Sequence, residues 1–233
     1  MAINCESSLI LKAICPPQKI ESITQMKRII DDKSRLTLIE KPFFDEINPI
    51  IKEISTNNVE GDIVFVGVYR GGGALYLKSL FEEYGFSRTC WLFDSFDGFK
   101  NQLLSENETT TLENFTSQGK FKFQPSSENV RSLFKKYSCD TNLKIVEGFI
   151  EDSLQSINFS KIAFLHIDID TFSSTTYALE QLYSKISKGG WIVIDDYHVN
   201  LYQCQEAVEK FRKTNEINNK MVTIGRYPCG WQV

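Results

Sequence analysis

Five short apolar segments, separated by stretches of helical character, constrain the fold of this 233-residue chain more than any other feature. They are rich in β-branched and aromatic residues and are apolar on both faces, as strands of a covered parallel sheet are. They occupy residues 62–68, 89–96, 143–149, 162–170 and 190–197. This alternation predicts an α/β fold, with right-handed crossovers and a doubly wound, mostly parallel sheet.

The stretches between the strands have the 3.6-residue period of helices. After the first strand, an apolar face built on Leu77 and Phe81 ends at Gly85. After the fourth strand, a similar face over residues 178–186 ends before Gly189 and its neighbouring glycine. Glycine just past an apolar face is a common helix stop. The spacing therefore predicts a helix in each crossover, with Ile186 inside the second.

The two ends of the chain extend this βαβ core. Residues 221–233 contain two short β-like pieces around Pro228 and Gly230, which predict an antiparallel hairpin. Residues 1–57 are interpreted as an N-terminal helical extension that acts as a lid and offers an apolar surface for self-association. Residues 58–233 form the Rossmann-like domain. The extension contains one apolar helical face, made of Phe43, Ile47, Ile50, Ile51 and Ile54.

Two of the predicted strands end abruptly in acid. The segment FLHIDID leads to Asp168, and GWIVIDDYH leads to Asp195 and Asp196. Neighbouring strands lie about 4.8 Å apart, so these carboxylates would meet, repel one another and require either a shared proton or a bound cation. Three such oxygens suit a hard divalent ion such as Mg²⁺. Asp170 is interpreted instead as a cap of the following helix.

A glycine-rich turn follows the first strand in VFVGVYRGGGALYLKSLF. Its pattern is neither the dinucleotide-binding G-x-G-x-x-G nor a P-loop, so it favours a nucleotide-like ligand held without a phosphate clamp, with tight packing as the alternative. Asp94, at the end of the second strand, is placed to accept hydrogen bonds from ribose hydroxyls. We expect Asp94→Ala to weaken cofactor binding with little loss of fold.

Composition excludes several classes of function. A net charge of −4 and a pI near 5.4 give no footprint for nucleic acid. No apolar run approaches the length of a membrane span, and the N-terminus lacks the pattern of a secretory signal, so we expect a cytoplasmic protein that binds no membrane. The six cysteines are scattered, with no Cys-x-x-Cys pair, and are expected to be reduced thiols.

Several motifs taken together resemble the macrocin and mycinamicin O-methyltransferase family. They are VGVYRGG, DSFDGF, NVRSLFKKY, IDIDTFSSTTYALEQLYSKISKGGWIVIDDY and CQEAVEKFR. The resemblance covers about residues 27–233 and is most specific from Asp168 to Tyr197. It implies the class I methyltransferase fold with a seven-stranded sheet, S-adenosylmethionine (SAM) as cofactor and a magnesium site. The implied acceptor is a small glycosylated or polyhydroxylated natural product.

The resemblance also assigns roles to particular residues. It makes Asp168, Asp195 and Asp196 the metal ligands. Two departures from the family pattern matter: Phe65 stands where an acid is usual, near the methionine end of SAM, and Thr171-Phe172 replaces Leu-Tyr in the acceptor pocket. The residues implied to bind SAM are Gly67, Tyr69, Arg70, Gly71, Gly72, Asp94, Ser95 and Phe96.

The implied chemistry is methyl transfer to a hydroxyl. Because SAM carries an activated methyl group, the protein must orient the acceptor oxygen and make it nucleophilic, and Mg²⁺ on the three acids would do both. Asp168 and His198 are the candidate bases, and His166 is interpreted as a packed core residue. Two alternatives stay open: a metal-assisted enzyme without methyl transfer, and a SAM-binding module without catalysis.

The long polar segment 100–127 has no clear period. Loops of this length in compact domains are usually functional lids or disordered, and Phe115, Phe121 and Phe123 would give a lid something to bury. We interpret the segment as a cover on the acceptor side, with a surface excursion as the alternative.

Overall fold

The computed structural model describes residues 36–98, 125–199 and 203–233. Within these ranges, seven strands form one sheet in the order β3-β2-β1-β4-β5-β7-β6. Strands β1 to β5 are parallel to one another, and β7 is antiparallel to both β5 and β6. The predicted parallel sheet with an antiparallel C-terminal hairpin is therefore confirmed. The strands are β1 (Asp62–Val66), β2 (Cys90–Asp94), β3 (Leu143–Glu147), β4 (Ile162–Ile167), β5 (Ile186–Ile194), β6 (Val222–Thr223) and β7 (Cys229–Gln232).

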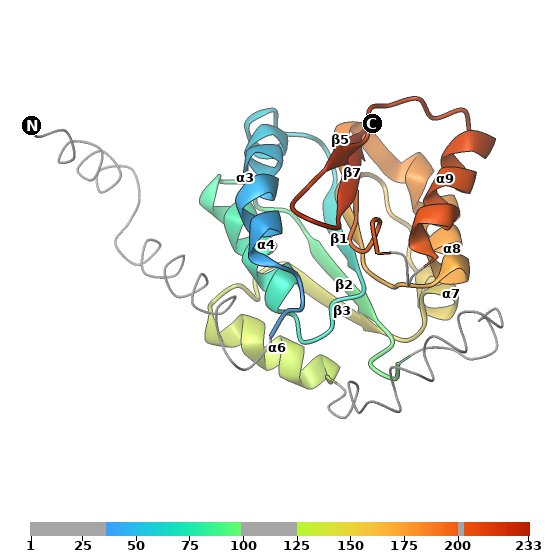
Figure 1. The fold of residues 1–233 in the computed structure, drawn as a ribbon. Helices are drawn as coiled ribbons and strands as arrows, with labels where there is room; N and C mark the ends of the chain where they lie inside the picture. Colours follow the sequence, from blue (N-terminus) through green and yellow to red (C-terminus); the bar gives the residue numbers. More distant parts are fainter. Residues whose placement is uncertain (1–35, 99–124, 200–202) are drawn as a thin grey trace, which may run out of the picture.

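Helices cover both faces of this sheet. Helices α3 and α4 lie on one side, and α8 and α9 lie on the other, with the strands between them (Figure 1). The helices are α3 (Lys41–Thr56), α4 (Gly72–Glu83), α6 (Ser127–Lys136), α7 (Ile150–Ser153), α8 (Phe172–Leu182) and α9 (Cys204–Thr214), with 3₁₀ turns η2 (Leu154–Ser156) and η3 (Tyr183–Lys185).

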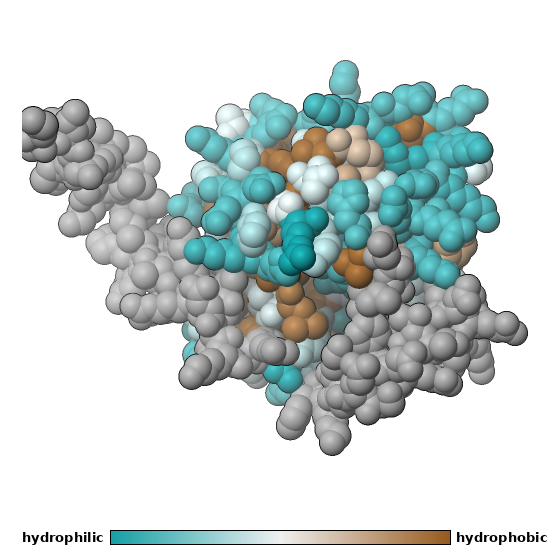
Figure 2. All heavy atoms as spheres, in the orientation of Figure 1, coloured by the Kyte–Doolittle hydropathy of each residue, from teal (hydrophilic) through white to brown (hydrophobic). Residues whose placement is uncertain are grey.

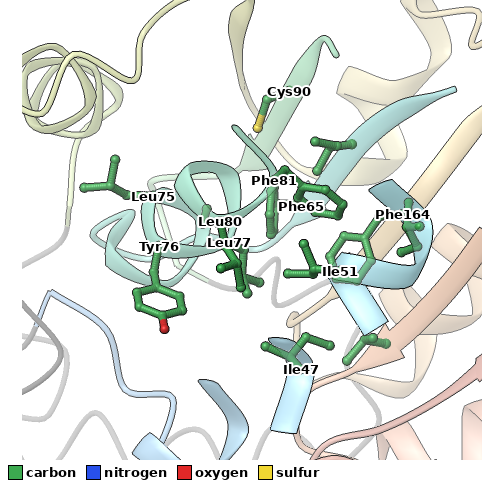
Figure 3. Close-up of a cluster of buried hydrophobic side chains, with 14 of the residues drawn as sticks. Ile47, Ile51, Phe65, Leu75, Tyr76, Leu77, Leu80, Phe81, Cys90 and Phe164 are labelled. Carbon is green, nitrogen blue, oxygen red and sulfur yellow. The ribbon is translucent and has the colours of Figure 1, made fainter. Parts of the chain in front are cut away.

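Two hydrophobic clusters form the core, one on each face of the sheet. Along β4, Phe164 belongs to the cluster under α3 and α4, whereas Leu165 belongs to the cluster under α8 and α9. This alternation is the period of two expected of a strand that is covered on both sides. In the first cluster, Phe65 and Phe164 point from the strands toward Ile51 of α3 and Phe81 of α4 (Figure 3).

Helix α3 packs directly on the sheet. All five members of the predicted apolar face, from Phe43 to Ile54, are buried. Burying one such side chain contributes about 1.5 to 3 kcal/mol, so this face anchors α3 firmly to the domain. Residues 1–35 of the predicted N-terminal helical extension lie outside the described residues.

The prediction for residues 178–190 is partly wrong. Helix α8 ends at Leu182, and Ile186 begins β5 instead of closing the helix. Gly189 has a φ of +81° inside β5, and the pairing of β4 with β5 shifts register between Ile162 and Phe164. A glycine inside a strand often marks such an irregularity, so the glycine pair belongs to an irregular strand and is not a helix stop.

The described surface is mostly hydrophilic on the face drawn in Figure 2, with small hydrophobic patches. Leu38, at 63% exposure, is the large hydrophobic side chain that is exposed among the described residues. Cys90, Cys139, Cys204 and Cys229 are buried free thiols, as predicted. Across residues 36–98, 125–199 and 203–233, every helix is too short or too polar to cross a membrane.

Most of the predicted cover at 100–127 lies outside the described residues, because the structure omits 99–124. The three phenylalanines assigned to that cover lie in the omitted range. At its described end, the Ser126 hydroxyl accepts a hydrogen bond from Asn129 N at 3.2 Å and caps α6.

Candidate active site

The carboxyl ends of β2, β1, β4 and β5 lie side by side, because these strands are consecutive neighbours in the sheet. Hydrogen bonds between the strands continue one residue past each strand end, which fixes the backbone of the glycine turn and of two acids. Gly67 N donates to Phe93 O at 2.8 Å, Asp168 N to Val66 O at 2.8 Å, and Asp195 N to Ile167 O at 2.9 Å.

Asp168, Asp195 and Asp196 converge as predicted. One oxygen of each carboxylate lies within 4.8 Å of the others. Consecutive side chains on a strand point to opposite faces, so Asp195 and Asp196 can share a site only if the backbone turns. It does: β5 ends at Ile194, a turn begins at Asp195, and Val199 N donates to Asp196 O at 3.0 Å.

Burial and neighbouring charges favour the protonated forms of Asp168 and Asp196. Burial, followed by the charge of Asp195, raises the pKa of Asp168 well above its usual range. Burial raises the pKa of Asp196 to about 9, with further contributions from the charge and the hydrogen bond of Asp170. Within the described residues, no salt bridge joins a lysine or an arginine to these carboxylates. Carboxylate oxygens held this close suit a hard divalent ion, whose charge offsets the repulsion. The residues present therefore fit the magnesium site that the resemblance implies.

The interpretation of Asp170 as a helix cap is wrong. The N-cap of α8 is Thr171, whose side chain accepts a hydrogen bond from Ser174 N at 3.4 Å. Asp170 has a left-handed φ of +61°, and its carboxyl group is hydrogen-bonded to that of Asp196. Burial raises the pKa of Asp170 to about 6. Asp170 is therefore a fourth carboxyl group of the acid site.

Asp94 accepts hydrogen bonds from the backbone of the glycine turn as well as lying next to it. Its Oδ2 accepts hydrogen bonds from Val68 N at 2.8 Å and Tyr69 N at 2.9 Å, and its Oδ1 accepts from Phe96 N at 2.8 Å. A carboxylate has about four lone-pair sites, which leaves capacity for a ribose hydroxyl. These three bonds do not support the expectation that Asp94 can be removed with little loss of fold.

The other residues predicted to bind SAM lie around Asp94. Tyr69 and Phe96 have φ values of +52° and +51°, and such strained backbone tends to occur at functional sites. The Arg70 guanidinium lies 5.2 Å from the centroid of the Tyr69 ring. The Ser95 hydroxyl donates to Gly98 O at 2.7 Å. Their contact with SAM stays a prediction.

The glycines of the turn have distinct neighbours. A side chain on Gly67 would collide with the Asp168 carbonyl group. A Cβ on Gly71 would lie 2.9 Å from Val130 of α6, and Gly72 N donates to Leu36 O at 3.0 Å. Tight packing, which the sequence left open, thus accounts for Gly71 and Gly72 in this structure, and their contact with SAM stays a prediction.

The two histidines differ in their surroundings. His198 is exposed; its Nε2 lies 3.3 Å from Thr223 Oγ1, and its backbone N donates to Tyr227 O, so it is tied to the C-terminal hairpin. His166 is 2% exposed, as its interpretation as a core residue requires. Phe65, which stands where the family usually has an acid, is buried in the core 5.9 Å from the His166 ring.

Comparison with known proteins identifies the family. The model of a family described as macrocin-O-methyltransferase (TylF) matches residues 22–232. The chain belongs to this macrocin O-methyltransferase family. The family assignment made from the motifs is therefore confirmed, and with it the expectation of a methyltransferase.

Curated relatives of this macrocin O-methyltransferase family member are O-methyltransferases. Demethyldecarbamoylnovobiocin O-methyltransferase of Streptomyces niveus is 29% identical over 198 residues, which are 84% of this chain and 75% of the relative. Mycinamicin III 3''-O-methyltransferase of Micromonospora griseorubida is 27% identical over 199 residues, or 84% of this chain and 78% of the relative. Both relatives are thus named for O-methyl transfer.

Solved structures confirm the class I SAM methyltransferase fold. The O-methyltransferase NovP is 28% identical, with a TM-score of 0.76 over 84% of this chain and 81% of that one. An O-methyltransferase from Bacillus cereus, solved in complex with SAH, is 12% identical, with a TM-score of 0.57 over 91% of each chain. The second likeness concerns the fold alone.

Proposed function

We propose that this chain is a SAM-dependent, Mg²⁺-dependent O-methyltransferase that acts on a hydroxyl of a sugar or another polyhydroxylated natural product. The observation that carries the proposal is the convergence of Asp168, Asp195 and Asp196 within 4.8 Å, beside the turn that begins at Gly67. In a member of an O-methyltransferase family, this arrangement supports a cation site next to the predicted cofactor site.

The two predicted sites have different roles, one in binding SAM and the other in binding Mg²⁺. Asp94 and the turn after Gly67 would hold the ribose of SAM, which supplies an activated methyl group. Asp168, Asp195 and Asp196 would hold Mg²⁺, which acts as a Lewis acid on acceptor oxygens when it is bound. Since β1 and β4 are adjacent strands, the sheet would hold the proposed SAM site and the proposed Mg²⁺ site at a fixed position relative to each other.

Asp170 joins Asp168 and His198 as a candidate for the group that takes the acceptor proton. Without a cation, burial and neighbouring charges raise the pKa values of Asp168 and Asp196, to about 9 for Asp196, so Asp196 is largely protonated at neutral pH. Asp170, with a pKa of about 6, is mostly ionised and so able to accept a proton. His198 is bonded to the hairpin and exposed, which favours Asp170 over it.

The acceptor class follows from the relatives. Their names specify demethyldecarbamoylnovobiocin and mycinamicin III as acceptors, and the latter is methylated on a hydroxyl at position 3''. We therefore propose an acceptor that offers neighbouring oxygens on a glycosylated scaffold. The alternatives of a non-methylating enzyme and of a binding module lose support, because the family and both relatives are named for methyl transfer.

Methyl transfer to a panel of acceptors tests this function. Purified protein is incubated with SAM, Mg²⁺ and glycosylated natural products, including demethyldecarbamoylnovobiocin and mycinamicin III, and SAH release and product mass are measured. We expect methylation of at least one sugar-bearing acceptor, its loss with EDTA, and its recovery on adding excess Mg²⁺. SAM binding, measured by calorimetry, should survive EDTA.

Asp195→Asn is the matched variant for this experiment, and Asp140→Asn, an exposed acid away from the site, is its control. Methyl transfer that proceeds unchanged in EDTA would remove the metal from the proposal while leaving the methyltransferase. Absence of SAM binding would instead overturn the cofactor assignment.

A further inference from the structure

His166 lies at the inner edge of the acid site. It is paired in register with Phe65 of β1 on one side and Val193 of β5 on the other. Its ring is surrounded by aromatic residues: the centroid of the Phe43 ring lies 5.8 Å away and that of Phe65 lies 5.9 Å away. Phe65 itself points into the apolar cluster in Figure 3. The imidazole therefore sits in apolar surroundings, where an unpaired polar atom is costly.

Two buried polar atoms face each other at this point. His166 Nε2 lies 3.7 Å from Asp195 Oδ1, and neither atom has a hydrogen-bond partner among the described residues. Leaving a buried polar atom unpaired costs about 1 to 3 kcal/mol, so two such atoms at this distance call for an explanation. A small rotation of the Asp195 carboxyl group would close the gap and satisfy both atoms.

We infer that His166 is a positioning residue: its Nε2–H holds Oδ1 of Asp195, so that the other oxygen of that carboxylate turns toward the bound cation. This inference rests on the proposed Mg²⁺ site and adds to it the group that orients one ligand. Carboxylates that ligate a metal are generally hydrogen-bonded in turn, and loss of that partner typically lowers metal affinity about 10- to 100-fold.

A purely structural role for His166 makes a different prediction. Position 166 is enclosed by aromatic rings, so a core role would be filled equally well by phenylalanine. A positioning role requires a donor at the place of Nε2. The His166→Gln variant would supply an amide N–H of similar reach, whereas the His166→Phe variant keeps a ring and removes the donor.

Calorimetric titration with Mg²⁺ separates these roles. We expect His166→Phe to weaken Mg²⁺ binding about 10- to 100-fold and His166→Gln to restore most of it. Phe43→Leu changes the same aromatic surroundings without removing the donor, and it should bind Mg²⁺ like the wild type. At saturating Mg²⁺, His166→Phe should recover most of its kcat, because only occupancy of the site is impaired.

Histidine NMR provides a test that needs no variant at position 166. The chain has two histidines, so ¹⁵N-labelled imidazole signals are assigned with His198→Asn alone. In the Mg²⁺-loaded protein, we expect the N–H proton of the His166 imidazole to reside on Nε2 and to exchange slowly with water. A proton on Nδ1 alone would overturn the inference even if His166→Phe failed to fold.

The outcomes distinguish this inference from the proposed function. If the wild type binds Mg²⁺ and the His166→Phe variant binds it with equal affinity, the role of His166 is overturned and the metal site is left intact. A His166→Gln variant as weak as His166→Phe would do the same. Wild-type protein that binds no Mg²⁺ at all would overturn the metal site, and the role of His166 with it.

Discussion

The backbone of Asp168 fills the space that a side chain on Gly67 would occupy. A Cβ built on Gly67 would collide with the Asp168 carbonyl oxygen and lie 2.7 Å from its carbonyl carbon, and Gly67 also has a φ of +83°. The turn predicted to bind SAM and the first acid of the proposed metal site are thus in direct contact. A change at Gly67 should affect both sites together.

Gly67→Ala should destabilise the protein and impair both sites. The left-handed backbone alone costs alanine about 1 to 2 kcal/mol, and the collision with the Asp168 carbonyl group adds to this cost. Urea denaturation gives the loss of stability, and calorimetry gives the affinities for SAM and Mg²⁺. Gly85→Ala is the matched control, because Gly85 has a φ of +74° with nothing within 4 Å of an added Cβ. Equal effects of the two variants would contradict the coupling.

The stability of the metal-free protein should fall as pH rises from about 4, near the pKa of an unfolded aspartate, to about 9. The folded-state pKa values of Asp168, Asp170 and Asp196 are raised, to about 6 for Asp170 and about 9 for Asp196. The folded state therefore binds more protons than the unfolded state, through Asp170 up to about pH 6 and through Asp196 up to about pH 9, and stability falls over each interval. Melting temperatures in EDTA measure the slope.

Two comparisons check the origin of this slope. Asp196→Asn should flatten it, because one buried ionisation is removed. Mg²⁺ should flatten or reverse it, because the cation binds the ionised carboxylates in place of protons. A slope that is the same for wild type and Asp196→Asn would assign it to other groups.

The sheet and the acid trio could be predicted from the sequence because both depend on local pattern and strand adjacency. Apolar runs that end in acid predict acids at the carboxyl edge, and right-handed crossovers bring β4 beside β5. Whether Asp195 and Asp196 share one site depends on the backbone turn after Ile194, which alternation alone could not settle.

Asp170 and Ile186 show what the sequence pattern could not resolve. Asp170 precedes a helix, where a cap is the usual role, and only its left-handed φ of +61° turns it toward Asp196. Ile186 continues an apolar helical spacing, but its pairing with Ile162 across the sheet places it in β5. In both cases tertiary contacts override a local preference.

Asp94→Ala should lower both SAM affinity and stability. The variant leaves three backbone N–H groups without their acceptor, which costs about 1 to 3 kcal/mol for each group that stays buried. Asp94→Asn, which retains one acceptor oxygen, should lose less stability. Asp97→Asn changes a neighbouring exposed acid and serves as the control for charge. Urea denaturation and SAM calorimetry measure the two effects, and full stability in Asp94→Ala would contradict the structural role.

Asp170→Asn and Thr171→Ala should separate the acid site from the helix cap. Thr171 caps α8, so Thr171→Ala should lower stability by about 1 kcal/mol. Asp170 is not the cap, and Asp170→Asn removes a half-buried charge beside Asp196, so the metal-free variant should be as stable as wild type or more stable. Its kcat should fall at least about 100-fold if Asp170 takes the acceptor proton. Thermal melts in EDTA and single-turnover methyl transfer measure these effects, with His198→Asn as the variant of the competing candidate base.

A loss of stability in Asp170→Asn with unchanged turnover would return Asp170 to a structural role. A larger loss of turnover in His198→Asn than in Asp170→Asn would make His198 the base.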